Sequence, residues 1–333
     1  MDIDFVILWV DGNDPTWQKE KSQYQKEQTD ESNSANRYRD WGLLPYWFRA
    51  VEQFAPWVRK VHFVTWGHLP RFLNVNAPKL HIVRHDEFIP KEYLPTFSSH
   101  VIEMNIHRIP DLAEHFVYFN DDMFLLRPFA PEDFFRDGLP CTYGGEVPLE
   151  LNGIIGIWQH AAVNDLGLVN AHFPKREAVA KHGGKYRDKR YRWKDNIRTL
   201  MLEKLYPDYF TGFQNLHAPA AYLKETFREI WAAEPEKLHG TCCDRFRTSD
   251  NVNQWVALWW QIASGTFSPA VIDNLVTGIE DSTIDELCRT IENQTHDYIC
   301  LNDPEGEIDF ERLSGRLVQA FEKLLPDRSE FEK

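Results

Sequence analysis

Four short apolar runs divide the first 125 residues of the chain and constrain its fold more than any other feature. Runs of this length, rich in Val, Ile and aromatic residues, are typical of buried strands. They are DFVILWV at 4–10, VHFVTW at 61–66, LHIVR at 80–84 and FVYF at 116–119. Segments with helical apolar spacing separate the first pair and the last pair, at 43–54 and 98–109. Strands alternating with helices predict an α/β fold with a mostly parallel, Rossmann-type sheet and helices on both faces.

The second half of the chain is predicted to be a mostly helical elaboration laid against the sheet. Its expected helices are 158–169, 193–205, 220–233, 251–263, 283–293 and 310–325. One further apolar run, 298–301, could return to the sheet as a strand. We therefore expect a sheet-bearing part at 1–150 and a helical part at 151–333, which together form one unit.

Composition excludes several classes of protein. With 37 basic and 51 acidic residues the net charge is −14, which argues against nucleic-acid binding through a general basic surface. The five cysteines contain no CxxC spacing, which favours a reducing compartment over a zinc or redox motif. The apolar run at 5–10 is too short and too acidic at its flanks for a signal peptide, and no segment approaches the roughly 18 apolar residues of a membrane span. A soluble cytoplasmic protein is expected.

Acidic residues follow three of the expected strands. They are DGND at 11–14, NDD at 120–122 and ND at 302–303. Ligands of open parallel sheets bind beyond the carboxyl ends of the strands, where residues distant in sequence converge. Oxygen-rich sets of this kind favour Mg²⁺ or Mn²⁺ with a substrate diphosphate completing the shell. The alternative is ordinary turn chemistry, the usual role of a lone Asp-Gly.

The same residues carry a family resemblance. The segment FVILWVDGNDP at 5–15 resembles the first block of the Stealth proteins, which include bacterial capsular polysaccharide phosphotransferases and the catalytic subunit of the animal lysosomal-enzyme N-acetylglucosamine-1-phosphotransferase. Further blocks are similar at RD 39–40, APWVR 55–59, LPTFSS 94–99, YFNDD 118–122, HAP 217–219, RTSD 247–250 and CLND 300–303. The blocks occur in the family's order and span most of the chain, which makes the match specific.

The resemblance implies a GT-A-like sheet that binds a nucleotide sugar, with a UDP-linked donor favoured. It implies transfer of a hexose-1-phosphate, such as N-acetylglucosamine-1-phosphate, to an acceptor hydroxyl of a saccharide or growing polysaccharide. Two alternatives stay open from the residues alone. One is a metal-dependent glycosyltransferase using the same site, and the other is a non-catalytic protein that binds nucleotide sugars or glycans. The expected location is cytoplasmic, with peripheral contact to the inner face of the membrane left open.

His217 and Arg247 are the residues expected to act on the substrate. Pro219 suits the first turn of the expected helix 220–233, so that the helix dipole would keep the nearby His217 imidazole neutral and able to accept a proton. His217 also matches the family's proposed catalytic histidine, the alternative being a capping or packed side chain. Arg247 aligns with a phosphate-contacting arginine, whereas Arg245 could instead pair with Asp244 at the surface.

Together these arguments define a predicted site. The metal ligands are Asp122 and Asp303, and the catalytic residues are Asp11, Asp121, His217 and Arg247. The predicted substrate contacts are Gly12, Asn13, Arg39, Ser98, Ser99, Glu103, Asn120, Arg245 and Asn302.

A basic run between residues 172 and 194 stands out in this acidic chain. It holds nine basic and two acidic residues, a net charge of +7. Gly183 and Gly184 offer a hinge, which predicts a mobile loop that closes over the donor diphosphate or guides an anionic acceptor. An anionic membrane surface and a plain solvated face are the alternatives.

Overall fold

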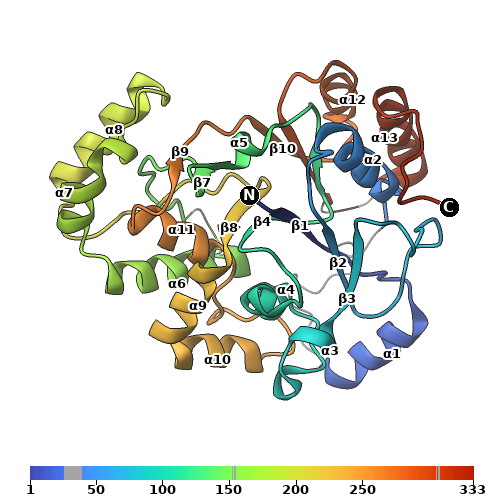
Figure 1. The fold of residues 1–333 in the computed structure, drawn as a ribbon, viewed down its shortest axis with the longest axis horizontal. Helices are drawn as coiled ribbons and strands as arrows, with labels where there is room; N and C mark the ends of the chain where they lie inside the picture. Colours follow the sequence, from blue (N-terminus) through green and yellow to red (C-terminus); the bar gives the residue numbers. More distant parts are fainter. Residues whose placement is uncertain (26–39, 152, 154, 305, 307) are drawn as a thin grey trace.

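A five-stranded sheet forms the centre of the molecule in the computed structural model, which describes all residues except 26–39, 152, 154, 305 and 307 (Figure 1). Its strand order is β3-β2-β1-β4-β8. The strands are β1 (Ile3–Leu8), β2 (Val61–Thr65), β3 (Leu80–Arg84), β4 (His115–Phe119) and β8 (Ala220–Leu223). The first four run parallel, and only β8 is antiparallel to its neighbour β4. The predicted α/β fold with a mostly parallel sheet is confirmed.

Helices cover both faces of the sheet because consecutive side chains of a strand point to opposite sides. Phe5 and Ile7 of β1 belong to one core and Val6 to the other. The first core is covered by α2 (Leu44–Phe54), α12 (Ile284–Asn293) and α13 (Phe310–Leu324). The second is covered by α4 (Ser99–Asn105), α6 (Ile157–His172), α9 (Lys224–Ala233), α10 (Pro235–Cys243) and α11 (Trp255–Ala263). Both sets surround the sheet in Figure 1.

A second, three-stranded sheet continues from the carboxyl end of β4. It has the order β10-β11-β5, with β10 (Asn274–Gly278), β11 (Tyr298–Asn302) and β5 (Met123–Leu125). The expected strand at 298–301 is therefore present, but it joins this sheet and not the central one. Further elements, besides two helices described below, are α1 (Pro15–Tyr24), α3 (His85–Phe88), α5 (Pro131–Phe134), β6 (Phe135–Arg136), β7 (Leu139–Thr142), β9 (Ser268–Pro269) and two 3₁₀ turns (Lys91–Tyr93 and Ile106–Arg108).

The prediction that a helix spans 220–233 is wrong in its first turn. Residues Ala220 to Leu223 form β8 and pair with β4, and the helix α9 begins only at Lys224. Pairing explains the difference, since β4 offers an unpaired edge on which Ala221 and Tyr222 become buried. His217 consequently precedes an edge strand and not a helix.

The prediction of a mobile basic loop at 172–194 is also wrong. The segment folds into α7 (Lys175–Tyr186) and enters α8 (Trp193–Leu205), with both candidate hinge glycines inside α7. The Lys175 ammonium is buried and lies 2.7 Å from Glu146 Oε2. The buried Tyr186 hydroxyl donates to the backbone carbonyl of Ile262 or Ala263. These contacts fix α7 on the body of the protein.

Among the helices that the structure describes, none combines the length and the apolar character needed to cross a membrane.

The Lys175–Glu146 pair supplies a test of the fold. Replacing Glu146 by leucine leaves the Lys175 charge buried without its partner, which should lower the free energy of unfolding by about 3–5 kcal/mol in urea titrations. The matched control is Arg176→Gln, which breaks the exposed pair with Asp208 and should leave stability nearly unchanged. Equal effects of the two substitutions would contradict the anchoring role given to Lys175.

Candidate functional site

Several carboxylates lie close to one another beyond the carboxyl end of β4. Asp121 and Asp122 lie in the turn that joins β4 to β5. The backbone N–H of Leu301 in β11 donates to the Asp122 carbonyl oxygen at 2.9 Å, which draws the end of β11 against this turn. Asp303 follows β11, and its Oδ1 accepts from Trp41 Nε1 at 2.9 Å. Acidic residues from two distant parts of the chain thus converge, as the sequence predicted.

The carboxylates in this cluster repel one another. Loss of hydration, and then the charges of Asp122, Asp40 and Asp303, raise the pKa of Asp121 to about 7. Asp121 is exposed as a whole residue, so it can exchange solvent for a cation that offsets these charges. In addition, Asp122 Oδ1 is buried and has no hydrogen-bond partner among the described residues. A cation at this position would relieve both costs.

The donor atoms suit a hard divalent cation. The charges of Asp122, Asp40 and Asp303 all act on Asp121, and ligation of Mg²⁺ or Mn²⁺ by Asp122 and Asp303 stays a prediction. A thiol also lies close, since ligand atoms of Cys300, Asp122 and His217 fall within 4.8 Å of one another. Burial, and then the neighbouring aspartates, raise the pKa of the Cys300 thiol. A thiol is also a soft ligand, whereas Mg²⁺ and Mn²⁺ prefer oxygen.

His217 lies beside the acidic turn, with Nε2 3.7 Å from Asp122 Oδ2. Its backbone adopts a left-handed conformation, with φ at 41°. The side chain of Asn215 accepts from the His217 N–H at 3.1 Å, and Asn274 Nδ2 donates to the carbonyl oxygens of Leu216 and His217 at 2.7 and 2.9 Å. The expectation that a helix dipole sets the histidine is therefore wrong. Two asparagine side chains hold it instead.

Arg247 and the two residues before it contact the segment at the start of α4. The Phe97 N–H donates to the Arg245 carbonyl at 2.9 Å, and the rings of Phe97 and Phe246 stack at 5.4 Å. Arg247 Nη2 then donates to Ser99 Oγ at 2.7 Å. Three successive residues thus fix the guanidinium, a group suited to binding phosphate oxygens.

A buried polar chain connects this arginine to the acidic turn. The Tyr118 hydroxyl lies 3.2 Å from Glu103 Oε1 and 2.6 Å from Asn120 Oδ1. Burial raises the pKa of Glu103, while the charge of Arg247 opposes the rise. Glu103 and Ser98 are both buried, and their predicted contact with substrate stays a prediction.

The turn after β1 occupies the same edge of the sheet, since β1 and β4 are parallel neighbours. The Asp11 N–H donates to His68 Nε2 at 2.7 Å, and Asp11 Oδ1 accepts from the Asn13 N–H at 2.9 Å. The Gly12 carbonyl accepts from Gln18 Nε2 at 2.7 Å. The predicted residues of this turn are thus at the expected edge, where turn chemistry accounts for their contacts.

The other predicted residues are more scattered. Arg245 lies with its guanidinium carbon 5.8 Å from the centre of the Tyr24 ring. Asn302 Oδ1 lies 3.6 Å from the Cys300 thiol. Arg39 lies outside the described residues.

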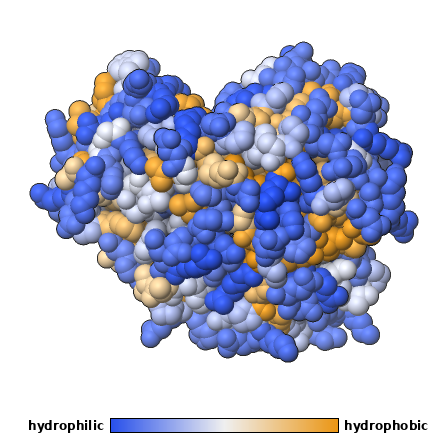
Figure 2. Space-filling view, viewed as in Figure 1, coloured by the Kyte–Doolittle hydropathy of each residue, from blue (hydrophilic) through white to orange (hydrophobic). Residues whose placement is uncertain are grey.

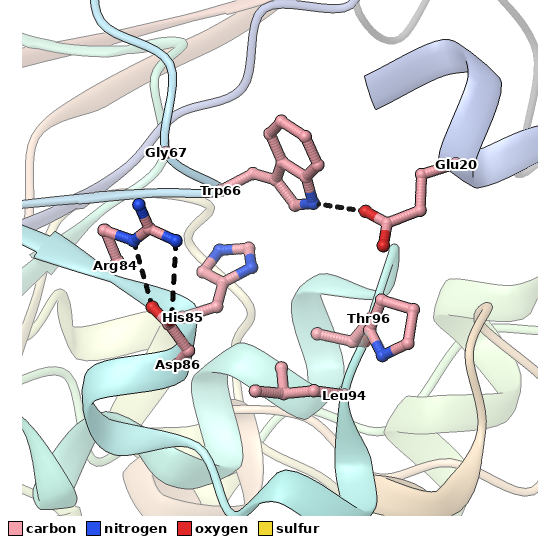
Figure 3. Close-up of a pocket in the computed structure, with 9 residues that line it drawn as sticks. Glu20, Trp66, Gly67, Arg84, His85, Asp86, Leu94 and Thr96 are labelled. Carbon is pink, nitrogen blue, oxygen red and sulfur yellow. Dashed lines mark hydrogen bonds and ion pairs between the residues drawn. The ribbon is translucent and has the colours of Figure 1, made fainter. Parts of the chain in front are cut away.

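A cavity of about 510 Å³ opens beyond the carboxyl ends of β2 and β3 (Figure 3). Trp66 lines it and donates from Nε1 to Glu20 Oε2 at 2.9 Å, and Arg84 pairs with Asp86 at 3.0 Å on the opposite side. His85 is also at the wall, and burial, followed by the charge of His68, lowers its pKa to about 4. No local sequence pattern predicts this cavity, because its walls come from four separate segments of the chain.

Comparisons with known proteins give the chain a family. Residues 1–28 match the family model of Stealth protein CR1, conserved region 1, and residues 37–141 match Stealth protein CR2, conserved region 2. The chain is 37% identical to the capsular polysaccharide phosphotransferase WcwK of Streptococcus pneumoniae, covering 99% of this chain and 98% of the relative. It is 39% identical to the receptor polysaccharide phosphotransferase WefC of Streptococcus gordonii, with the same coverage.

Two further proteins are less similar. The chain is 35% identical to the exopolysaccharide phosphotransferase cps2G of Lactiplantibacillus plantarum, over 100% of this chain and 96% of the relative. Among solved structures, the galactosyltransferase LgtC, in complex with donor and acceptor sugar analogues, aligns over 95% of both chains with a TM-score of 0.37 and 11% identity. A TM-score of this size does not establish a shared fold.

The acidic cluster makes a prediction that needs no substrate. Mn²⁺ should bind at one site in calorimetric titrations, and Asp122→Asn should weaken that binding about tenfold or more, because the amide removes a charge from the ligand set. Asp327→Asn, at an exposed position near the C-terminus, is the control and should bind Mn²⁺ like the wild type. Unchanged Mn²⁺ affinity in Asp122→Asn would exclude Asp122 as a ligand.

Proposed function

The chain belongs to the Stealth family of sugar-phosphate transferases, and we propose that it moves a hexose-1-phosphate from a nucleotide sugar to an acceptor hydroxyl. The named relatives act on capsular, receptor and exopolysaccharides, so we place the reaction in the synthesis of a bacterial surface polysaccharide. The proposed donor is UDP-linked, such as UDP-N-acetylglucosamine, and the acceptor is a saccharide or growing polysaccharide. The proposed location is the cytoplasm, at the inner face of the membrane.

One observation carries the proposal. His217 lies at 3.7 Å from an aspartate of a carboxylate cluster that is suited to a divalent cation. A proton acceptor beside a diphosphate-binding cation is what transfer to a hydroxyl requires. A protein that only binds nucleotide sugars has no use for such a pair.

The bond changes follow from this arrangement. The acceptor hydroxyl oxygen attacks the β-phosphorus of the nucleotide sugar, and its proton passes to Nε2 of His217. The bond between the β-phosphorus and the bridging oxygen breaks, and the nucleoside monophosphate leaves with the electron pair of that bond. The sugar keeps its phosphate and becomes linked to the acceptor through a phosphodiester.

The other residues hold the donor in this proposal. The guanidinium of Arg247, fixed by Ser99, neutralises phosphate oxygens as charge shifts to the leaving group. A cation bound by Asp122 and Asp303 would supply further charge stabilisation to the diphosphate. The cavity lined by Trp66 and Arg84 would take the nucleoside, since aromatic and polar groups face it together. The parts 1–150 and 151–333 contribute to one catalytic unit.

Analysis of the released nucleotide tests the proposed reaction. Incubation with a panel of nucleotide sugars, Mg²⁺ and a saccharide acceptor should release the nucleoside monophosphate in amounts equal to the phosphodiester product. The measurement is ion-exchange chromatography of the nucleotides, with a sample free of acceptor as the control for hydrolysis. Release of the nucleoside diphosphate would show that the enzyme is a glycosyltransferase.

Two substitutions test the role of His217. Removing the proton acceptor in His217→Ala should lower kcat on the order of 10²–10⁴-fold with little change in KM for the donor. Asn274→Ala releases the backbone that holds His217 and should lower kcat about 10- to 100-fold. Asn293→Ala is the control, since this side chain bonds only within its own helix α12. Normal turnover in His217→Ala would remove the histidine from the mechanism.

A further inference from the structure

Helix α8 presents most of its apolar side chains to solvent, and two of its three buried residues are polar. Asp195, Thr199 and Leu202 form its buried face, at the helical spacing i, i+4 and i+7. The opposite face, which we call the α8 face, consists of Trp193, Ile197, Leu200, Met201 and Leu205, each between 38% and 67% exposed. An amphipathic helix of a globular protein normally has the reverse orientation.

Polar contacts hold α8 in this orientation. Arg198 donates from Nε to the Glu146 carbonyl oxygen and from Nη2 to the Tyr143 hydroxyl, both at 3.0 Å, and its Nη1 donates to Asp195 at 3.1 Å. Thr199 Oγ1 accepts from the Glu146 N–H at 3.1 Å, next to the buried ion pair with Lys175. Because the buried polar groups are satisfied, the apolar face is directed outward by specific bonds. Contiguous apolar surface of this kind marks an interaction site.

Aromatic residues extend the α8 face beyond the end of the helix. Tyr206 and Tyr209 are both exposed, and their rings lie 5.8 Å apart. Trp193 occupies the other end, with Lys194 Nζ 5.7 Å from the centre of its ring. Amphipathic rings at the edges of an apolar stripe, with lysines beside them, are typical of helices that lie in the interface of a bilayer.

The surroundings of the α8 face are basic although the chain is acidic. Residues 172–208 contain eleven basic and five acidic residues, a net charge of +6 in a chain of −14. Lys189, Lys194 and Lys204 are exposed and form no ion pair within the described part of the chain. The acidic side chains nearby are largely held by arginines, as in the pairs of Glu203 with Arg187 and of Asp195 with Arg192. The available charge on this surface is positive.

We propose that the α8 face docks on the surface of an anionic lipid bilayer. The apolar side chains would enter the interface while the three lysines contact lipid phosphates. A second copy of the chain fits less well, because a symmetric contact would bring the same lysines of both copies together. Helices α7 and α8 form a lobe at one edge of the molecule, on the side opposite the C-terminus (Figure 1). Figure 2 shows apolar surface on this lobe, beside a notch. The lobe is therefore accessible to a flat surface.

This inference rests on the proposed function only where it places the protein at a membrane. Docking there would bring an acceptor held at the membrane to the site. It assigns Lys189 and Lys194 of the basic run 172–194 to membrane contact and not to closure over the donor. Vesicle binding needs no turnover, so its outcome and that of the nucleotide assay are independent.

Flotation with lipid vesicles tests the inference on the full chain. The wild type should float with vesicles of phosphatidylcholine and phosphatidylglycerol, and binding should fall as salt is added. Ile197→Glu with Met201→Glu should weaken binding at least ~tenfold, because charges replace inserted apolar groups. Neutralising Lys189, Lys194 and Lys204 to glutamine should weaken it roughly a hundredfold, at about fivefold per lysine.

The control is the double variant Val75→Glu and Val271→Glu, which places the same charges at equally exposed apolar positions elsewhere and should float like the wild type. The α8 variants should keep wild-type turnover with a water-soluble acceptor. Equal flotation of α8 variants and control, or equal binding to pure phosphatidylcholine, would overturn the assignment. So would a dimer in light scattering that the α8 substitutions dissociate while no vesicle binding is seen.

Discussion

The hydrogen bond from the Leu301 N–H to the Asp122 carbonyl joins the two parts of the chain that carry the carboxylate cluster of Asp121, Asp122 and Asp303. Asp122 follows a strand of the central sheet, whereas Leu301 belongs to a strand that packs with α12 and α13. Because this bond fixes the end of β11 against the β4 turn, Asp303 comes close enough to Asp121 to contribute to its raised pKa. The cluster that can hold a cation therefore depends on a tertiary contact across 179 residues of sequence.

Buried polar residues hydrogen-bond to the groups of the candidate site. Glu103 and Tyr118 are buried between the arginine and the acidic turn, and Asn274 holds the backbone on either side of His217. These bonds position the Asn120 side chain and the backbone of His217. Phosphoryl transfer depends mainly on positioning and charge, so a rigid second layer of polar contacts is what the chemistry needs.

The sequence predicts the central strands and the acidic edge well, because apolar runs and strand-end residues are local signals. It fails at β8, where AAYL at 220–223 has no strand signal of its own and becomes extended only by pairing with β4. It fails again at the basic run, since the partner of Lys175 is Glu146, 29 residues earlier. Asn215, Asn274 and Trp41 were missed because they act through contacts that no local pattern reveals. The division of the chain at residue 150 stays a prediction.

The fate of the β-phosphorus tests the central claim most directly. A nucleotide sugar labelled with ³²P at the β-position would be incubated with the enzyme, Mg²⁺ and acceptor, and the label would be followed by chromatography. The proposed transfer of a sugar-1-phosphate moves the β-phosphorus with the sugar, so the label should appear in the acceptor product and not in the released nucleotide. Label that remains in a nucleoside diphosphate, with unlabelled sugar on the acceptor, would contradict the account.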